Sequence, residues 1–198
     1  NTFSENITLN LASGHNKIQI AVQDEKGRES LKETIDVECL QQSKPNLYIV
    51  SVGTSIYKDK RYNLDYAAKD AKDIVAQFQK ENDLYAEVKS KVLTDQQSLG
   101  KNIQELKNFL KDATIDDIVI VFVAGHGLLD AQYDYFYGTH DVDFNNPGKN
   151  GLSYERLESI LDGIAPLKKI LIMDTCHSGE VEEEELLVSE EDVVEDDD

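Results

Sequence analysis

Three stretches of this chain are almost uninterrupted in their apolar character, and they constrain the fold more than any other feature of the sequence. They cover residues 47–52, 118–124 and 170–173, and a glycine directly follows the first two. A strand with one face in water alternates apolar and polar residues, whereas a strand buried on both faces does not. The chain therefore predicts a largely parallel sheet that is covered by helices on both sides.

The segments between these strands have helical periodicity. Apolar residues recur every three or four positions, and Ser98 and Ser153 are predicted N-caps, with Gly163 as a predicted C-cap. The predicted helices cover residues 65–80, 99–110 and 153–161, and a further strand covers residues 88–93. We expect residues 128–151 to form a long polar loop. The alternation of strands and helices predicts an α/β fold, a three-layer α/β/α sandwich with a mostly parallel sheet.

The first 43 residues have a different pattern, which predicts β-structure. Short strands are expected at residues 5–11, 17–22 and 31–37, with turns at residues 13–16 and 24–27. Three short strands cannot close a sandwich alone, so we interpret them as the end of an immunoglobulin-like domain. The predicted organisation is a β segment at 1–43, a catalytic domain at 46–179 and an acidic flexible linker at 180–198.

Charge and cysteine content narrow the classes of partner and compartment. The net charge is −19, and 12 of the 39 acidic residues lie in residues 180–198, which contain no lysine or arginine. Such a charge argues against nucleic acid and anionic membranes as partners. No apolar run approaches the roughly 20 residues of a membrane span. With only two cysteines, Cys39 and Cys176, a reducing, cytoplasmic setting is expected.

Two of the apolar strands lead into polar tips framed by glycine. One tip presents His126 and the other presents Cys176. Because sites in parallel sheets form at the carboxyl ends of strands, we expect the two side chains to meet there. An imidazole can take the proton of a thiol, and backbone amides at Gly127 and Cys176 could stabilise the oxyanion that forms on a carbonyl. This combination predicts nucleophilic attack on peptide bonds.

These tips also carry a family resemblance. The sequences Ala124-Gly125-His126-Gly127 and Asp174-Thr175-Cys176-His177-Ser178-Gly179 resemble the caspase-like cysteine peptidases of clan CD. The likeness is nearer the metacaspase and bacterial caspase-like branch than the animal caspases, and residues 64–71 resemble that branch at the start of its first helix. The resemblance implies a cysteine endopeptidase, with His126 as base and acid, Cys176 as nucleophile, and the amides of Gly127 and Cys176 as the oxyanion hole.

The resemblance also implies a substrate preference. In the metacaspase branch the first substrate pocket, S1, is acidic and receives arginine or lysine, and Asp174 and Asp70 match its acids. A carboxylate there would pair with a guanidinium, while Ala67 and Ala124 would leave room at the pocket wall. The alternative roles stay open: Asp174 could orient His177 or cap a turn, and Asp70 could be a solvated acid of the first helical turn.

A caspase-like sheet usually has six strands, and this sequence predicts four. The remaining strands are therefore expected from a second polypeptide, released by cleavage beyond residue 198 because residues 180–198 contain no basic residue. The β segment before the domain suggests upstream regulatory domains. By analogy with bacterial multidomain relatives, activation by processing or by a signal, in defence or programmed death, is the expected setting.

Two other interpretations compete with that of a protease. The first is a catalytically inactive caspase-fold interaction module, against which the presence of both His126 and Cys176 speaks. The second is a metal site, but the potential zinc ligands have no usual spacing. Some metacaspases need calcium, and Asp130, Asp134, Asp141 and Asp143 cluster in the long loop, although their spacing fits no EF-hand. We therefore expect no obligatory cofactor.

Overall fold

The computed structural model describes residues 4–41, 44–80 and 82–177. Their main sheet contains six strands, and four of these are parallel. The parallel strands are β3 (Leu47–Gly53), β4 (Val88–Thr94), β5 (Ile118–Leu129) and β8 (Lys168–His177). β3 lies between β4 and β5, and β8 pairs with the other side of β5. The predicted mostly parallel sheet is confirmed.

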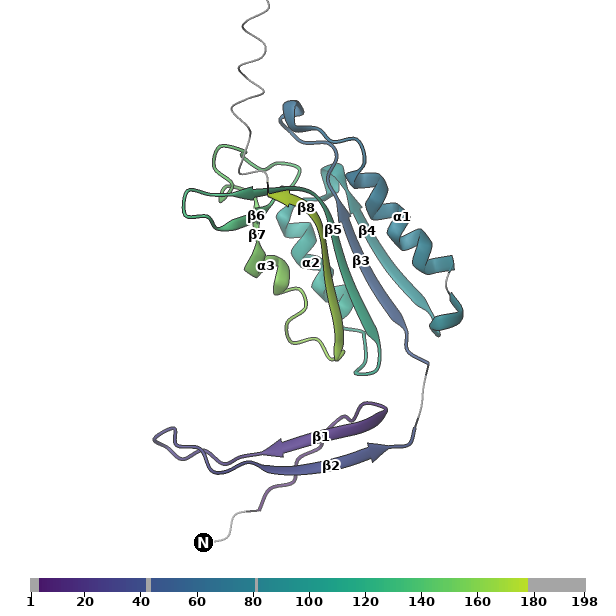
Figure 1. Ribbon diagram of the computed structural model, residues 1–198, viewed down its shortest axis with the longest axis vertical. Helices are drawn as coiled ribbons and strands as arrows, with labels where there is room; N and C mark the ends of the chain where they lie inside the picture. Colours follow the sequence, from purple (N-terminus) through teal and green to yellow (C-terminus); the bar gives the residue numbers. More distant parts are fainter. Residues whose placement is uncertain (1–3, 42–43, 81, 178–198) are drawn as a thin grey trace, which may run out of the picture.

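Helices cover both faces of this sheet, which confirms the three-layer arrangement. Helix α1 (Ala67–Lys80) lies on one face, whereas α2 (Gly100–Leu110) and the short α3 (Tyr154–Glu158) lie on the other (Figure 1). Three short 3-10 helices occur in the connections: η1 (Lys60–Tyr62), η2 (Asn82–Leu84) and η3 (Asp95–Gln97).

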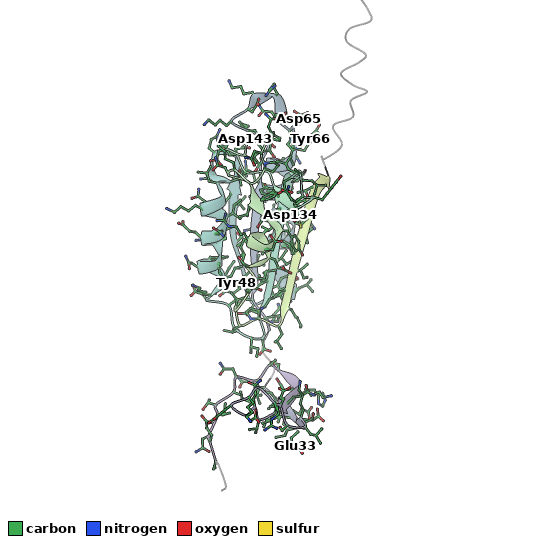
Figure 2. The ribbon with its side chains drawn as sticks, turned by 90° about the vertical axis from the view of Figure 1, so that its left-hand side faces the viewer. Glu33, Tyr48, Asp65, Tyr66, Asp134 and Asp143 are labelled. Atoms are coloured by element: carbon green, nitrogen blue, oxygen red, sulfur yellow. The ribbon has the colours of Figure 1, made fainter. Side chains whose placement is uncertain are left out.

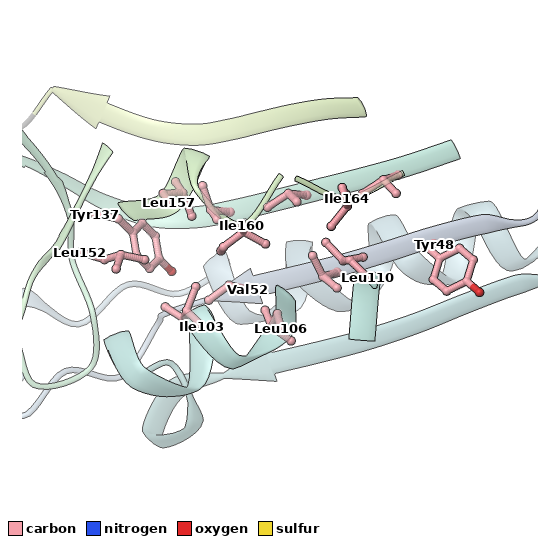
Figure 3. Close-up of a cluster of buried hydrophobic side chains, with 14 of the residues drawn as sticks. Tyr48, Val52, Ile103, Leu106, Leu110, Tyr137, Leu152, Leu157, Ile160 and Ile164 are labelled. Carbon is pink, nitrogen blue, oxygen red and sulfur yellow. The ribbon is translucent and has the colours of Figure 1, made fainter. Parts of the chain in front are cut away.

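The two faces of β3 and β5 are packed by alternate residues, as the geometry of a strand requires. On the α2 and α3 face lie Val50, Val121, Ile103 and Leu157, members of the cluster shown in Figure 3. On the α1 face, Ile49 and Ile120 pack with Val75 of α1. Every residue of β3 is buried. Burial on both sides explains the unbroken apolar runs of the sequence.

The start of α1 comes very close to β3, and Gly53 permits this approach. A Cβ atom at Gly53 would lie 2.2 Å from the carbonyl oxygen of Ala67. Only a residue without a side chain fits there. Since Ala67 is the first residue of α1, this contact fixes where the helix begins relative to the end of the strand.

The sheet has two short antiparallel strands that sequence analysis missed. β6 (Tyr135–Tyr137) pairs with the end of β5, and β7 (Leu152–Ser153) pairs with β6. Both fall in or beside the segment expected to be a polar loop. Strands of two or three residues are too short for a periodic pattern to reveal them. The expectation that this chain supplies only four strands was therefore wrong.

Helix boundaries agree with expectation at one predicted cap and differ at the others. Ser153 caps α3, because its hydroxyl accepts from the amide of Arg156 at 3.4 Å. Ser98 does not cap α2: the cap position is Leu99, and Ser98 is wholly buried in contacts described below. Helix α3 ends at Glu158 rather than at residue 161, so Gly163 lies beyond its cap, Ser159, although its φ is +65°.

The N-terminal segment forms a separate two-stranded antiparallel sheet, seen below the main body in Figure 1. Its strands are β1 (Gly14–Ile20) and β2 (Glu33–Cys39), and the predicted turn at residues 24–27 is present. The expected strand at residues 5–11 does not form within the described residues, and residues 14–16 belong to β1 instead of a turn. The predicted acidic linker, residues 180–198, lies outside the described residues.

The longest helix of the described segments is α1, with 14 residues. Among those segments, no helix has both the length and the apolar character that crossing a membrane would require.

Candidate active site

The two residues expected to form a catalytic pair are direct neighbours in the sheet. The parallel register of β5 and β8 pairs His126 with Cys176. Adjacent strands lie about 4.8 Å apart, so the two residues have adjacent backbones. The sequence had suggested that both residues lie just beyond the ends of their strands. In the structure, both lie within the strands. β5 continues because β6 returns along it and pairs with Gly127 through Leu129.

Hydrogen bonds to two tyrosines help to hold His126. Its backbone amide donates to the hydroxyl of Tyr57 at 3.0 Å, and its ring Nε2 lies 2.9 Å from the carbonyl oxygen of Tyr62. A carbonyl oxygen can only accept, so this contact assigns the hydrogen to Nε2 and leaves Nδ1 as the acceptor. The tautomer of the imidazole is therefore set by the backbone of the connection between β3 and α1.

Aromatic rings surround the imidazole. Ring centroids of Tyr57, Phe144 and Tyr62 lie 5.2, 5.5 and 6.3 Å from that of His126. The Tyr62 and Phe144 rings stack on each other at 3.6 Å, and the imidazole is nearly perpendicular to both, at 88° and 85°. Burial among these rings lowers the pKa of His126, while the Tyr62 carbonyl acts in the opposite direction. The neutral imidazole is thus favoured near neutral pH.

Beneath His126 the end of β5 rests on a buried network of hydroxyl groups. Tyr137 donates to the carbonyl of Ala124 at 2.9 Å, and its oxygen lies 2.8 Å from Thr54 Oγ1. The contacts continue from Thr54 to Ser98 at 2.7 Å, and Ser98 donates to the carbonyl of Asp95 at 2.6 Å. Burial raises the pKa of Tyr137, so it stays protonated and able to donate. The network couples β3, β5, β6 and η3.

The four residues expected to form the S1 pocket line one cavity of about 360 Å³. Ala67 and Asp70 come from the start of α1, Ala124 from β5 and Asp174 from β8. The other lining residues come from the segment before α1 and from β5: Asn63, Leu64, Asp65, Tyr66 and Gly125. No lysine or arginine is among them. The structure therefore brings together the four expected residues, which lie up to 107 positions apart in the sequence.

The cavity has a third carboxylate that sequence analysis missed, that of Asp65. Across the described ranges, Asp65, Asp70 and Asp174 form no side-chain hydrogen bond and no ion pair within 4 Å. Asp65 precedes α1 and looks from the sequence like an ordinary acid before a helix. Only the packing of that helix against β3 places it in the same cavity as Asp174.

A sequence model of the caspase domain family matches residues 48–197. This chain belongs to the caspase domain family. The fold is also similar to the crystal structure of protein GSU0716 from Geobacter sulfurreducens, with a TM-score of 0.52 and 20% identity. That match covers 68% of this chain and 52% of the other, so the chain spans about half of that structure's length. A search of curated proteins found no match.

The caspase domain family is a family of cysteine peptidases, and these enzymes are hydrolases. Membership agrees with the family resemblance of the two glycine-framed motifs. The likeness to the Geobacter protein supports the fold alone.

The two residues that are expected to supply the oxyanion hole lie on neighbouring strands, β5 and β8. Gly127 follows His126 in β5 and is paired in register with Tyr137 of β6 and His177 of β8. Cys176 is the register partner of His126. The two residues that would donate their amides are therefore one position apart on neighbouring strands. The side chains of Cys176 and His177 lie outside the described part.

The carboxylates of three of the four aspartates considered for calcium have other partners. Asp130 accepts from the amides of Gln132 and Asp134, both at 2.9 Å, and Asp143 accepts from Lys149 at 3.3 Å. Asp141 accepts from the hydroxyl of Thr139 at 3.1 Å. These contacts stabilise turns. Among the residues whose placement is described, no group of three or more potential ligands could hold a metal ion.

Proposed function

We propose that this caspase domain is a cysteine endopeptidase that cleaves protein chains after arginine and, less efficiently, after lysine. The observation that carries the proposal is the register that pairs His126 with Cys176. The family match supports peptidase chemistry in general. The acidic cavity beside the pair supports the choice of a basic residue before the cut.

His126 acts as the base in the first step. Because Nε2 is bound to the carbonyl of Tyr62, Nδ1 accepts the proton of the Cys176 thiol. The thiolate then attacks the carbonyl carbon of the scissile bond. A carbon–sulfur bond forms, and the π electrons of the carbonyl move to its oxygen. The lowered pKa of His126 keeps it in the accepting form.

The amides of Gly127 and Cys176 stabilise the resulting oxyanion. Loss of one such donor typically costs about 3 kcal/mol of transition-state stabilisation. The intermediate collapses when the carbon–nitrogen bond breaks and the leaving amine takes the proton from His126. The thioester that remains is hydrolysed by a water molecule deprotonated by His126, which restores the thiol and releases the carboxyl product.

Substrate selection rests on the three carboxylates of the cavity. Asp70 and Asp174 are the S1 acids, and Asp65 adds a third negative charge beside Ala67 and Ala124. A guanidinium can donate to two carboxylates at once, whereas an ammonium is a compact point charge. This favours arginine over lysine. It disfavours aspartate by charge repulsion.

Regulation by processing is part of the proposal. β8 pairs only with β5 among the described strands, and about half of Ile170 on β8 is exposed. Exposed apolar strand edges invite pairing with further strands. A second polypeptide, made by proteolytic processing, would add them. Upstream regulatory domains and a role in defence follow only by analogy, and a reducing, cytoplasmic compartment would keep the thiol active.

Peptide substrates that differ only in the residue before the cut test the proposal. The full-length protein should cleave arginine peptides fastest, lysine peptides more slowly and aspartate peptides negligibly. Cys176→Ala should abolish cleavage, and His126→Ala should lower kcat/KM by about 10²- to 10⁴-fold. Asp174→Asn should lower kcat/KM for arginine peptides while Cys176 still reacts with iodoacetamide. Equal cleavage by wild type and Cys176→Ala would refute the assignment.

The second candidate, an inactive interaction module, is favoured by one observation. The β1–β2 sheet carries exposed apolar side chains, those of Ile20 and Ile35, and offers surface for docking. Labelling with a peptidyl electrophile separates the two functions. A scaffold would leave Cys176 unlabelled in the wild type, whereas the protease would be labelled there and lose the label in His126→Ala.

A further inference from the structure

The two tyrosines that bind His126 belong to one segment, the β3–α1 connection (residues 54–66). The hydroxyl of Tyr57 accepts from the His126 amide, and the carbonyl of Tyr62 binds ring Nε2. The orientation of the imidazole therefore depends on what holds this connection in place.

The connection lies at the carboxyl end of the parallel strands. Its last residues, Asp65 and Tyr66, lie at the opposite end of the domain from Tyr48, near the start of β3 (Figure 2). Apart from the three residues of η1, the connection has no regular secondary structure. Ladders of backbone hydrogen bonds hold little of it, so contacts with side chains matter more here than in a strand or helix.

The side chain of Asp95 binds the start of the connection. Its Oδ1 accepts from the backbone amides of Ser55 at 3.0 Å and Ile56 at 2.9 Å. Asp95 lies at this point because it follows Thr94, the last residue of β4, whose register partner is Gly53 at the end of β3. Two amides beyond the end of β3 thus bind one carboxylate from beyond the end of the neighbouring strand.

Ser55 also binds the far end of the same connection. Its carbonyl accepts from the amide of Leu64 at 2.8 Å, and its hydroxyl accepts from the amide of Ala68 in α1, also at 2.8 Å. The loop that contains Tyr57 and Tyr62 is therefore closed at its base, between Ser55 and Leu64. A shift of Ser55 would displace both ends of this loop.

Two other side chains bind the connection, each at one backbone group. Nδ1 of His140 lies 2.6 Å from the carbonyl of Ile56. The side chain of Asn63 accepts from the amide of Tyr57 at 2.9 Å. Asp95 differs from both because it binds two consecutive amides, one of which belongs to the residue that closes the loop.

The backbone of Asp95 has a conformation that few residues adopt. Its φ is +51°, in the left-handed region, which aspartate and asparagine visit more readily than most residues with a side chain. Its carbonyl accepts from the amide of Ser98 at 2.8 Å and from the hydroxyl at 2.6 Å. Backbone and side chain of Asp95 both take part in this junction, and only asparagine or glycine would keep the backbone as it is.

We propose that Asp95 is a positioning residue for His126, because it holds the connection whose two tyrosines bind the histidine. The inference rests on the proposed function, since the imidazole needs a fixed orientation in order to exchange a proton with Cys176. The carboxylate acts through the backbone of the connection and needs no contact with the substrate. Misplacement of a catalytic group by about 1 Å can lower a rate about 100-fold, so a displaced connection would slow the reaction.

Two substitutions of Asp95 separate its side chain from its backbone. Asp95→Asn keeps an oxygen acceptor and tolerates the positive φ, so it should behave like the wild type. Asp95→Gly keeps the backbone conformation and removes the acceptor of Ser55 and Ile56. Asp130→Ala is the matched control, because the Asp130 carboxylate also accepts from two backbone amides, both at 2.9 Å, in the turn between β5 and β6.

The first readout is the exchange of the ring Nε2 proton of His126 with water, measured by proton NMR in the full chain carrying Cys176→Ala. The bond to the Tyr62 carbonyl protects this proton, so exchange requires local opening. Exchange should be about 10-fold faster in Asp95→Gly and unchanged in Asp95→Asn and Asp130→Ala. A role in overall stability alone would lower the melting temperature without changing this local exchange.

The second readout is cleavage of an arginine peptide by the variants with Cys176 intact. Asp95→Gly should lower kcat about 10- to 100-fold. KM should change less, because Asp70 and Asp174 lie on α1 and β8, outside the connection. Asp95→Asn should retain the wild-type kcat.

Unchanged exchange in Asp95→Gly would overturn the positioning role, as would equal effects in Asp130→Ala or a failure of Asp95→Asn to match the wild type. In an active protein, an unchanged kcat in Asp95→Gly would overturn it as well. Faster exchange in Asp95→Gly, in a protein that cleaves no peptide, would support the hold of Asp95 on His126 and refute the proposed function.

Discussion

The two strands that carry the candidate catalytic pair have very different surroundings. β5 lies between β3 and β8, and its residues 119–125 are buried without a break. β8 pairs only with β5 among the described strands. The register places Ile120 beside Ile170, yet Ile120 is 3% exposed and Ile170 is 47% exposed. His126, the candidate base, therefore lies on a central strand, and Cys176, the candidate nucleophile, lies on a strand at the edge of the described sheet.

This difference gives the site one side in the buried centre of the sheet and one side on a half-exposed strand. His126 is held by Tyr57, Tyr62 and the rings around it before any substrate arrives. Within the described ranges, no strand pairs with the outer edge of the strand that carries Cys176 and Asp174. A strand added at that edge would bury β8 without disturbing the base. Control of activity would then act on the nucleophile and the specificity pocket together.

The largest expected effect compares the two neighbours directly. Ile120→Ala should lower the free energy of unfolding by about 2–5 kcal/mol, because it leaves a cavity in a closed core. Ile170→Ala should cost less than about 2 kcal/mol, since half of that side chain already meets water. Denaturant unfolding of both variants measures the difference. Equal losses would mean that β8 is covered in solution and that the contrast between centre and edge is wrong.

A smaller effect tests the hydroxyl groups that brace each strand. Tyr57→Phe leaves the amide of His126 without its acceptor, and an unpaired buried donor costs about 1–3 kcal/mol. Tyr135→Phe removes a 2.7 Å contact with the hydroxyl of Thr175, which is only half-buried and can bind water instead. We expect that variant to lose less than about 1 kcal/mol.

Thermal unfolding gives both values, and Tyr133→Phe is the control because its ring is 82% exposed. If Tyr135→Phe proves the more damaging of the two, the edge strand is braced more firmly than the central one.

The smallest effect comes from the titration of His126 itself. Burial lowers its pKa in the folded protein from the ordinary value of 6.5, so the unfolded chain binds a proton first as the pH falls. The folded protein should therefore lose stability as the pH drops below 6.5, until the folded pKa is also passed. His126→Asn should remove this part of the pH dependence. An unchanged slope in that variant would show that the imidazole is better solvated than the surrounding rings suggest.

Much of the fold was predictable from the sequence because burial on both faces leaves a simple pattern. The apolar runs located β3, β5 and β8, and Ser153 located the start of α3. Ser98 shows the limit of such patterns. Its position before a helix is typical of a cap, but its hydroxyl is recruited by Thr54 and Asp95 from other elements. For Ser98, the tertiary contacts with Thr54 and Asp95 therefore outweigh the local preference of serine for a helix cap.

The sequence by itself determined the class of fold, the two glycine-framed motifs and the choice of a histidine and a cysteine as candidates. It also suggested the four S1 residues, because their types matched a known pattern. The tertiary structure alone decided the register that pairs His126 with Cys176, the packing of Phe144 beside the imidazole and the position of Asp65 in the cavity. The physical reason is that periodicity and glycine spacing are local signals. Register, ring packing and the shape of a cavity depend on segments that meet only once the sheet has formed.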